Sequence, residues 1–343
     1  MKKYLLPESG NFYKANLHCH TTLSDGRLTP EEIKELYKSQ GYSIVAYTDH
    51  NILIPHNDLS DDTFLALNGL EMDTNEHEII PCPKYNKTNH VCYIALEPDN
   101  FVNPMWHRTM YKTPVHVAEN AHKVIFDEAK PDYFRKYSHE GISEMMNIGR
   151  EEGFFVTYNH PTWSKETYAD YTGFKGMHAM EMFNGSCLTL GYDEYNYRVY
   201  DDILRNGNRI FAIGADDNHN KYPFGNKRCD SCVAFTMIKA ESLEYKAVTN
   251  ALLAGNFYAS EAPEIYELTF EDLKVHIKTS PAESIAINYM TRGASVEFAE
   301  EAPITEATFE IPDDIGYFRL TVTDERGKRA TTNAYFLDEL IAK

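Results

Sequence analysis

The chain has 343 residues, of which 43% are hydrophobic, so it is long enough for one large barrel or for a barrel with an appended unit. Its 33 Lys and Arg residues against 52 Asp and Glu give a net charge of -19, which disfavours a long nucleic acid as partner. No segment approaches the ~20 apolar residues of a membrane span and the start has no apolar run of secretory length, so we expect a soluble, cytoplasmic protein without membrane contact.

The stretch 16–32 combines metal-ligand residue types with a turn and a helix start. Side chains alternate between faces in an extended segment, so His18 and His20 point the same way. Asp25 and the glycine after it turn the chain, and Thr29 is the expected N-cap of a helix. A lone His-x-His is as compatible with chance as with a metal site, so its interpretation depends on the rest of the chain.

The same arrangement recurs, because several short apolar strands are followed by a His, Asp or Glu. Strands predicted near 43–47, 64–70, 154–158, 176–180 and 209–213 precede, in that order, His50, Glu71, His160, Glu181 and the group Asp216, Asp217 and His219. Helical patterns at 30–40, 140–152, 193–206 and 242–254 alternate with these strands and predict a barrel or a doubly wound sheet. Function collects at the carboxyl ends of the strands in such folds, and a central metal cluster would account for this pattern.

Three parts of the chain depart from this pattern. His90 stands at the start of the apolar run 91–96, so its position after a strand does not select it. Residues 97–139 are rich in His, Pro and aromatic residues, and they form either a cover over the site mouth or a surface excursion. From residue 264 onward, short alternating strands at roughly ten-residue spacing predict a small β-sandwich, in which His276 lies on a polar face.

Cysteine spacing gives no independent metal site. Of the six cysteines, only Cys229 and Cys232 are suggestively spaced, and no second pair exists to complete a tetrathiolate zinc site. We therefore expect reduced thiols that are mostly packed in the interior.

The assembled motifs resemble those of the polymerase and histidinol phosphatase (PHP) superfamily of metal-dependent phosphoesterases. They span about residues 15–260 in the family order: His18-Cys-His20 with Ser24-Asp25-Gly26, Thr48-Asp49-His50, Gly69-Leu-Glu71, His90-Val, Asn159-His160-Pro161 and Asp217-Asn-His219. The resemblance implies an α/β fold, an irregular seven-stranded β/α barrel similar to a TIM barrel, over residues 1–262. The sandwich-like unit would then occupy residues 263–343, and residues 97–139 would be an irregular insertion.

The resemblance also implies two or three divalent ions, of manganese, iron or zinc, and a set of ligands. One ion would be held by His18, His20, Glu71 and the Asp of the Asp-x-His motif, a second by Glu71, His90 and His160, and a third by Asp25, His50 and His219. The doubled Asp216-Asp217 leaves two candidates for that Asp. Because residues two apart in an extended chain share a face, we favour Asp217, with Asp216 as the alternative.

Hydrolysis of a small phosphate ester is the expected activity, by attack of a metal-bridged hydroxide on a small phosphorylated metabolite. Lys227 and Arg228 are the nearest cations to expect at the phosphate, although a solvated basic pair explains them equally well. Glu181 is more simply explained as a charged residue that orients either a ligand or the Asn184 loop. The alternatives are a carbamate or amide hydrolase with the same site, or a binding or regulatory protein that retains metals.

Overall fold

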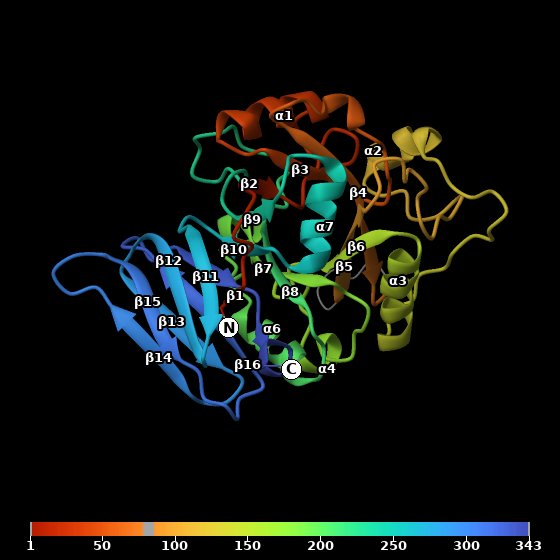
Figure 1. Cartoon of the computed structure of the whole chain (residues 1–343). Helices are drawn as coiled ribbons and strands as arrows, with labels where there is room; N and C mark the ends of the chain where they lie inside the picture. Colours follow the sequence, from red (N-terminus) through yellow and green to blue (C-terminus); the bar gives the residue numbers. More distant parts are fainter. Residues whose placement is uncertain (1, 78–85, 342–343) are drawn as a thin grey trace.

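A computed structural model of the chain describes residues 2–77 and 86–341 and shows an α/β protein with large mixed sheets and few helices (Figure 1). Cys82 lies outside the described residues, and the other five cysteines are free, as expected of reduced thiols. Among the described helices, none is long and apolar enough to cross a membrane.

A curved sheet carries the first two-thirds of the chain, with its strands side by side in chain order. They are β2 (Asn11–Asn16), β3 (Ile44–Tyr47), β4 (Leu65–Asn75), β5 (Thr88–Ala95), β6 (Phe154–Tyr158), β7 (Ala179–Asn184) and β8 (Phe211–Ala215). Neighbours pair in parallel except at β5, which is antiparallel to both β4 and β6. The carboxyl ends of six of these strands therefore meet at one edge.

Two strands that the sequence pattern did not reveal extend this sheet beyond β2. They are β9 (Phe235–Ala240), antiparallel to β2, and β10 (Phe257–Ser260), antiparallel to β9. The Thr236 hydroxyl accepts from Gly214 N at 3.1 Å and donates to Gly214 O at 2.8 Å, which holds β8 beside β9. Between these two described strands there is no backbone ladder. Among the described residues, the pairing thus shows a curled sheet with a seam bridged by a side chain, and the irregular seven-stranded barrel that was predicted is not confirmed.

The four longer helices follow the predicted ones with small shifts of their starts: α1 (Pro30–Ser39), α3 (His139–Glu151), α6 (Tyr197–Arg205) and α7 (Tyr245–Ala254). The start of α1 has the expected capping box, in which Thr29 Oγ1 accepts from Glu32 N and Glu32 Oε2 accepts from Thr29 N. Shorter helical turns are η1 (Asn57–Leu59), α4 (Tyr168–Tyr171), α5 (Gly185–Thr189) and α8 (Leu337–Ile341).

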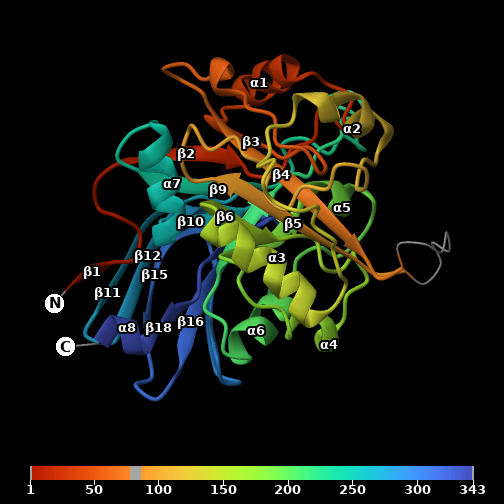
Figure 2. The ribbon, with the colours of Figure 1, turned by 90° about the vertical axis from the view of Figure 1, so that its right-hand side faces the viewer.

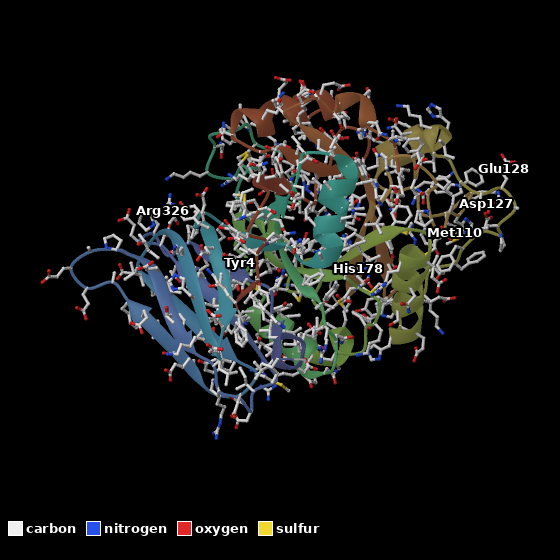
Figure 3. All side chains as sticks on the ribbon, in the orientation of Figure 1. Tyr4, Met110, Asp127, Glu128, His178 and Arg326 are labelled. Carbon is white, nitrogen blue, oxygen red and sulfur yellow. The ribbon has the colours of Figure 1, made fainter. Side chains whose placement is uncertain are left out.

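The 97–139 segment contains only two short helical turns, α2 (Val115–Asn120) and η2 (Ala121–Lys123). It protrudes at the right of Figure 1, and the labelled Met110, Asp127 and Glu128 mark its outer part in Figure 3. Its inner part is packed, because Val117 and Val124 lie in a small core with Ile52. The segment therefore lies against the loop after β3.

The C-terminal strands build two facing sheets. One contains β11 (Ile265–Glu271), β12 (Lys274–Ala282) and β15 (Ile304–Glu310); the other contains β13 (Ser284–Tyr289), β14 (Ala294–Phe298), β16 (Tyr317–Thr323), β17 (Arg329–Thr332) and the short β18 (Tyr335–Phe336). Phe270 of β11 stacks on Phe318 of β16 with ring centroids 6.2 Å apart, inside one shared hydrophobic core.

Strand pairs cross the domain boundary predicted at residues 262–263. At the other end of the chain, β1 (Lys3–Tyr4) completes the β11 sheet, and β10 pairs with β17 so that the second C-terminal sheet continues into the curved sheet. Figure 2 shows β1 beside β11 and β12 at the edge away from α3. The C-terminal strands are thus joined to the rest of the molecule by backbone hydrogen bonds.

Candidate metal centre

The carboxyl edge of the curved sheet gathers the residues selected from the sequence. His18 and His20 follow β2, His50 follows β3, His160 follows β6, and Asp217 and His219 follow β8, while Glu71 lies within β4. Glu71 lies inside its strand because β4 is longer than predicted and continues as the partner of β5. Its register beside His50 is set by an isolated parallel bridge between the two residues.

His90 reaches the same place from the opposite direction. It is near the start of β5, and β5 is antiparallel to its neighbours, so its amino end lies at the edge where the parallel strands end. Asn159 N donates to His90 O, which ties the start of β5 to the end of β6. The reversed strand therefore explains why His90 did not fit the rule of following a strand.

Glu71 occupies the middle of the cluster and is fully buried. Its Oε1 lies 2.9 Å from His90 Nδ1, 3.2 Å from His160 Nε2 and 3.2 Å from His18 Nε2. Its Oε2 lies 3.0 Å from His50 Nδ1. One carboxylate thus contacts imidazoles from four different strand ends, which is the geometry needed for a bridging ligand.

The ligand-type atoms fall into overlapping groups that share members. Within each group the atoms lie within 4.8 Å of one another: His18, His20 and Asp217; His18, Glu71 and His160; His50, Glu71 and His90; and His20, Asp25, His50 and His219. The groups differ from the predicted sites: Glu71 is not in the group of His18, His20 and Asp217, His90 and His160 fall in separate groups that share Glu71, and His20 joins the Asp25 group. All nine predicted ligands are therefore brought together.

The structure separates the two neighbouring aspartates. Asp217 Oδ1 lies 3.0 Å from His20 Nε2 and 3.3 Å from His18 Nε2. Asp216 points elsewhere and accepts from the backbone N–H groups of residues 232–234 and from the Tyr37 hydroxyl. Asp217 has a φ of 52°, so the extended-chain argument for it does not describe the local backbone, although the residue it favoured is the one at the centre.

Further side chains hold the imidazoles in place. Glu181 is buried, and its Oε1 accepts from His18 Nδ1 at 2.7 Å, which directs the other ring nitrogen of His18 toward the centre. Glu181 Oε2 accepts from the backbone N–H of His160, and Ser164 Oγ lies 3.2 Å from His160 Nδ1. Glu181 therefore has the orienting role expected for it, between two strand ends.

The loop that carries Asp25 is tied down by a neighbouring carboxylate. Asp49 accepts from the backbone N–H and hydroxyl of Thr21 and from the Ser24 hydroxyl. Because His50 follows Asp49 directly, the same turn places both His50 and the Asp25 loop.

Charge in the centre is balanced between carboxylates and imidazoles. Burial acts to raise the pKa of Glu71 and of Asp217, but the surrounding imidazoles outweigh it and hold both pKa values well below their usual range. Burial together with the charges of His50 and His219 lowers the pKa of His20 to about 4. Ionised carboxylates and a neutral imidazole are the forms that donate lone pairs to a cation.

Unpartnered polar atoms indicate that the cluster fits divalent ions. His20 Nδ1, Asp25 Oδ1 and Glu71 Oε2 are buried and make no hydrogen bond among the described residues. The Nε2 atoms of His18 and His20 face each other at 3.1 Å, an arrangement in which two imidazoles direct ring nitrogens at one point. Imidazole and carboxylate donors suit zinc, iron or manganese, so the donor set fits the ions expected from the sequence.

A cavity of about 250 Å³ opens above the cluster. Besides ligand-type residues, its lining includes Trp163, Ser186, Cys187, Leu190 and Lys221. None of the described residues of the 97–139 segment lines it, so the segment supports the ligand loops from outside rather than covering the mouth.

The predicted phosphate-binding pair is not at this cavity. Lys227 and Arg228 are exposed and absent from its lining, and Arg228 Nη1 donates to the Tyr222 hydroxyl. The chain turns at Asn220, which has a φ of 56°, and this places Lys221 rather than the later basic pair at the rim. Sequence reasoning missed Lys221 because an exposed lysine in a loop has no distinguishing pattern.

Comparisons with protein-family models and with the curated proteins found no match. Solved structures similar to the chain include a two-domain protein from Bacteroides vulgatus containing a predicted PHP-like metal-dependent phosphoesterase, with 15% identity, 97% of both chains covered and a TM-score of 0.46. A candidate metal-dependent phosphoesterase from Bifidobacterium adolescentis shares 17% identity over 64% of this chain and 91% of its own, with a TM-score of 0.39. An amidohydrolase from Chromobacterium violaceum, with bound sulfate and no metal, shares 15% identity over 60% of this chain and 87% of its own, with a TM-score of 0.34.

One of these proteins is described as PHP-like, the family whose motifs the sequence resembles, and a second as a metal-dependent phosphoesterase. At these identities and TM-scores, the reaction and the substrate have to be inferred from the site itself.

Proposed function

We propose that this chain is a metal-dependent hydrolase that cleaves a small phosphate monoester. The observation that supports it most directly is the set of overlapping His and carboxylate groups around the buried Glu71, at the base of an open cavity. Imidazoles and carboxylates that converge in one place, with His20 Nδ1, Asp25 Oδ1 and Glu71 Oε2 left without a hydrogen bond among the described residues, are suited to hold more than one divalent ion. The predicted sites, with Glu71 shared between them, would be the places of binding.

Divalent ions in this cluster would activate a water molecule and offset the negative charge of the phosphoryl oxygens. In the reaction, the water oxygen forms a bond to phosphorus, the ester P–O bond breaks, and the leaving oxygen takes up a proton. The chain contributes geometry: Glu181 fixes the orientation of His18, Asp49 fixes the Asp25 loop, and Lys221 places a positive charge at the rim. A phosphate monoester is anionic, so this lysine favours its entry.

A matched pair of histidine variants tests the assignment. The protein is stripped with a chelator and reloaded with Mn²⁺ or Zn²⁺, and bound metal and phosphate release from p-nitrophenyl phosphate are then measured. His160→Ala should lower turnover by more than about 100-fold. That loss is larger than the one expected when a residue that only hydrogen-bonds a metal ligand is replaced. His276→Ala should leave turnover and metal content unchanged, because His276 contacts Thr308 on the distant β12–β15 face.

The same reloaded protein should be assayed with an aryl carbamate in parallel. Phosphate release without carbamate cleavage supports the phosphoesterase proposal, whereas carbamate cleavage alone overturns it in favour of a carbamate or amide hydrolase. Bound metal without either activity would identify a protein that retains metals for binding or regulation. At most one ion per chain after reloading would contradict the multinuclear assignment.

A further inference from the structure

The cavity above the cluster has two chemically different sides. Its lining combines imidazoles and carboxylates, which we call the floor, with three apolar side chains, Trp163, Cys187 and Leu190, which we call the apolar wall; Ser186 also lines it. Leu190 is 65% exposed at the rim of an otherwise polar site. A leucine that is exposed in this place does not contribute to the protein core, and it is available to a bound molecule.

Trp163 stands in a fixed orientation in this wall. Its ring meets His90 edge to face, with centroids 5.4 Å apart at 70°, and meets His160 at 5.0 Å and 86°. Its backbone N–H donates to the buried carboxylate of Glu194, which fixes the loop that follows His160. The ring is therefore held before any ligand arrives, so little conformational freedom is lost when a ligand packs on it.

The remaining wall residues keep this side apolar. Cys187 is buried, and burial raises the pKa of its thiol, so the side chain remains neutral. Its backbone N–H donates to Oδ1 of Asn184, the N-cap of α5. This bond fixes the start of the helix that carries Cys187 and is followed by Leu190. Sugar hydroxyls placed against Trp163, Cys187 and Leu190 would find Ser186 as the one hydroxyl side chain among the described lining residues, so most of them would lose hydrogen bonds, which costs binding energy.

Charge and size restrict the ligand further. Lys221 is the only Lys or Arg among the described lining residues, so the rim suits one phosphoryl group rather than a di- or triphosphate. The volume of about 250 Å³ lies below the usual range of sites for drug-sized ligands. A phosphoryl group together with one ring-sized apolar group is of suitable size.

We infer that the site takes monoesters of phosphate with a small apolar, aryl-type alcohol, whose ring packs against Trp163 and Leu190 while the phosphoryl group faces the floor and Lys221. This inference rests on the proposed function for the identity of the phosphoryl group. The apolar wall itself is a separate property, so it can be tested by binding alone.

The test measures dissociation constants of phenylphosphonate and methylphosphonate for the Mn²⁺-loaded protein by titration calorimetry. Both probes resist hydrolysis and carry the same anionic head, so their ratio reports only the contribution of the ring. Phenylphosphonate should bind about tenfold more tightly, because packing one ring face on the wall removes apolar area from water. Leu190→Asn should remove most of this ratio without adding charge, and Lys221→Met should weaken both probes by a similar factor.

Matched controls are Leu253→Asn, at an exposed leucine on α7, and Lys175→Met, at an exposed lysine outside the cavity. Both should leave the two dissociation constants unchanged. Equal affinity for the two probes, no binding of either, or a full phenyl preference in Leu190→Asn would overturn the inference.

Turnover separates this inference from the proposed function. If phenylphosphonate is preferred but neither phenyl phosphate nor glycerol phosphate releases phosphate, the phosphoesterase proposal fails and the apolar wall stands. If both esters are hydrolysed with equal kcat/KM and the probes bind equally, the activity stands and the wall does not select the substrate.

Discussion

At the scale of single residues, Asp216 and Asp217 show how one step along the chain changes the role of a carboxylate. Asp216 is buried and satisfies three consecutive backbone N–H groups at the start of the segment that leads into β9. Asp217 contacts the two histidines that follow β2. One residue therefore holds the backbone, and the other belongs to the candidate metal centre.

Amide substitutions should separate these two roles. Asp216→Asn should destabilise the metal-free protein by about 2–3 kcal/mol, because the new amide N–H₂ group faces donors that it cannot satisfy. Asp217→Asn should change metal-free stability less but should weaken metal binding, since a charged donor is lost. Urea unfolding and metal titration of both variants measure this. If the two variants lost the same stability and bound metal equally well, the two aspartates would not have separate roles.

Glu166 offers a pH dependence that is independent of the metal centre. It is buried, and burial raises its pKa to about 8 from the usual 4.5, although Tyr158, Tyr137 and Asn89 donate to it and act in the opposite direction. The folded state therefore binds a proton that the unfolded state releases between pH 4.5 and 8. The stabilisation is complete below pH 4.5 and is lost as pH rises through that window.

We therefore expect Glu166→Gln to gain stability relative to the wild type as pH increases from 5 to 8, by up to about 1.4 kcal/mol per pH unit. Thermal unfolding of both proteins across this range gives the difference. Because the histidines of the centre titrate in both proteins, the difference isolates Glu166. A pH-independent difference would show that the Glu166 carboxyl is not protonated in the folded state.

At the scale of elements, the 97–139 segment supports the loop beside the candidate metal centre. Arg135 is buried, and its Nη1 donates to Asn51 Oδ1 at 2.6 Å and to Asp73 O at 2.7 Å. Asn103 donates to Asn51 O from the same segment. Asn51 has a φ of 63° and directly follows His50, so these bonds hold the backbone at a ligand position.

Removal of this support should reach the metal centre. Arg135→Met is expected to cost about 2–4 kcal/mol, because it leaves Asp73 and Asn51 without a buried cationic partner, and to weaken binding of the ion nearest His50. Arg108→Met is the matched control, since the Arg108 side chain is 39% exposed and its bonds stay within the 97–139 segment. Thermal unfolding and metal stoichiometry should separate the two variants; equal effects would show that the segment acts only on itself.

At the scale of the whole molecule, the N-terminal and C-terminal parts form one hydrophobic core. Tyr258 of β10 lies in that core with Ile265 and Val275, and its hydroxyl accepts from Ile265 N. Arg319 of β16 reaches back to α6 and makes a two-point ion pair with Asp201. Backbone pairing, apolar packing and a buried charge therefore all cross the boundary at residues 262–263.

Unfolding should accordingly be a single cooperative transition of the full chain. Differential scanning calorimetry should give one peak in which the calorimetric and van't Hoff enthalpies agree. The measurement is best made on metal-free protein, so that metal release does not shape the peak. Two resolved transitions, with the C-terminal strands unfolding first, would instead support two independent domains.

The sequence alone indicated which residue types collect at the site, because an apolar strand followed by His, Asp or Glu is a local pattern. Capping at Thr29 and the helices near 140–152 and 242–254 are also local, since they depend on neighbours within a few residues. For that reason, these elements and the candidates that follow strands could be predicted from local patterns, whereas the full set of nine, with His90, came from the resemblance of the motifs to a known family. The strands β9 and β10 were missed because their pattern is short and their pairing is distant.

Only the tertiary structure decided the features that depend on contacts far apart in the chain. The position of His90 follows from the reversed direction of β5, and the choice between Asp216 and Asp217 follows from a positive φ and from donors at residues 232–234. Trp163 and Leu190 line one cavity although β7 lies between them in sequence, and β10 pairs with β17 although the strands β11 to β16 lie between them. Strand direction, seam geometry and shared cores are set by packing between distant segments. Local residue patterns reflect only near neighbours in sequence, so that packing cannot be predicted from them.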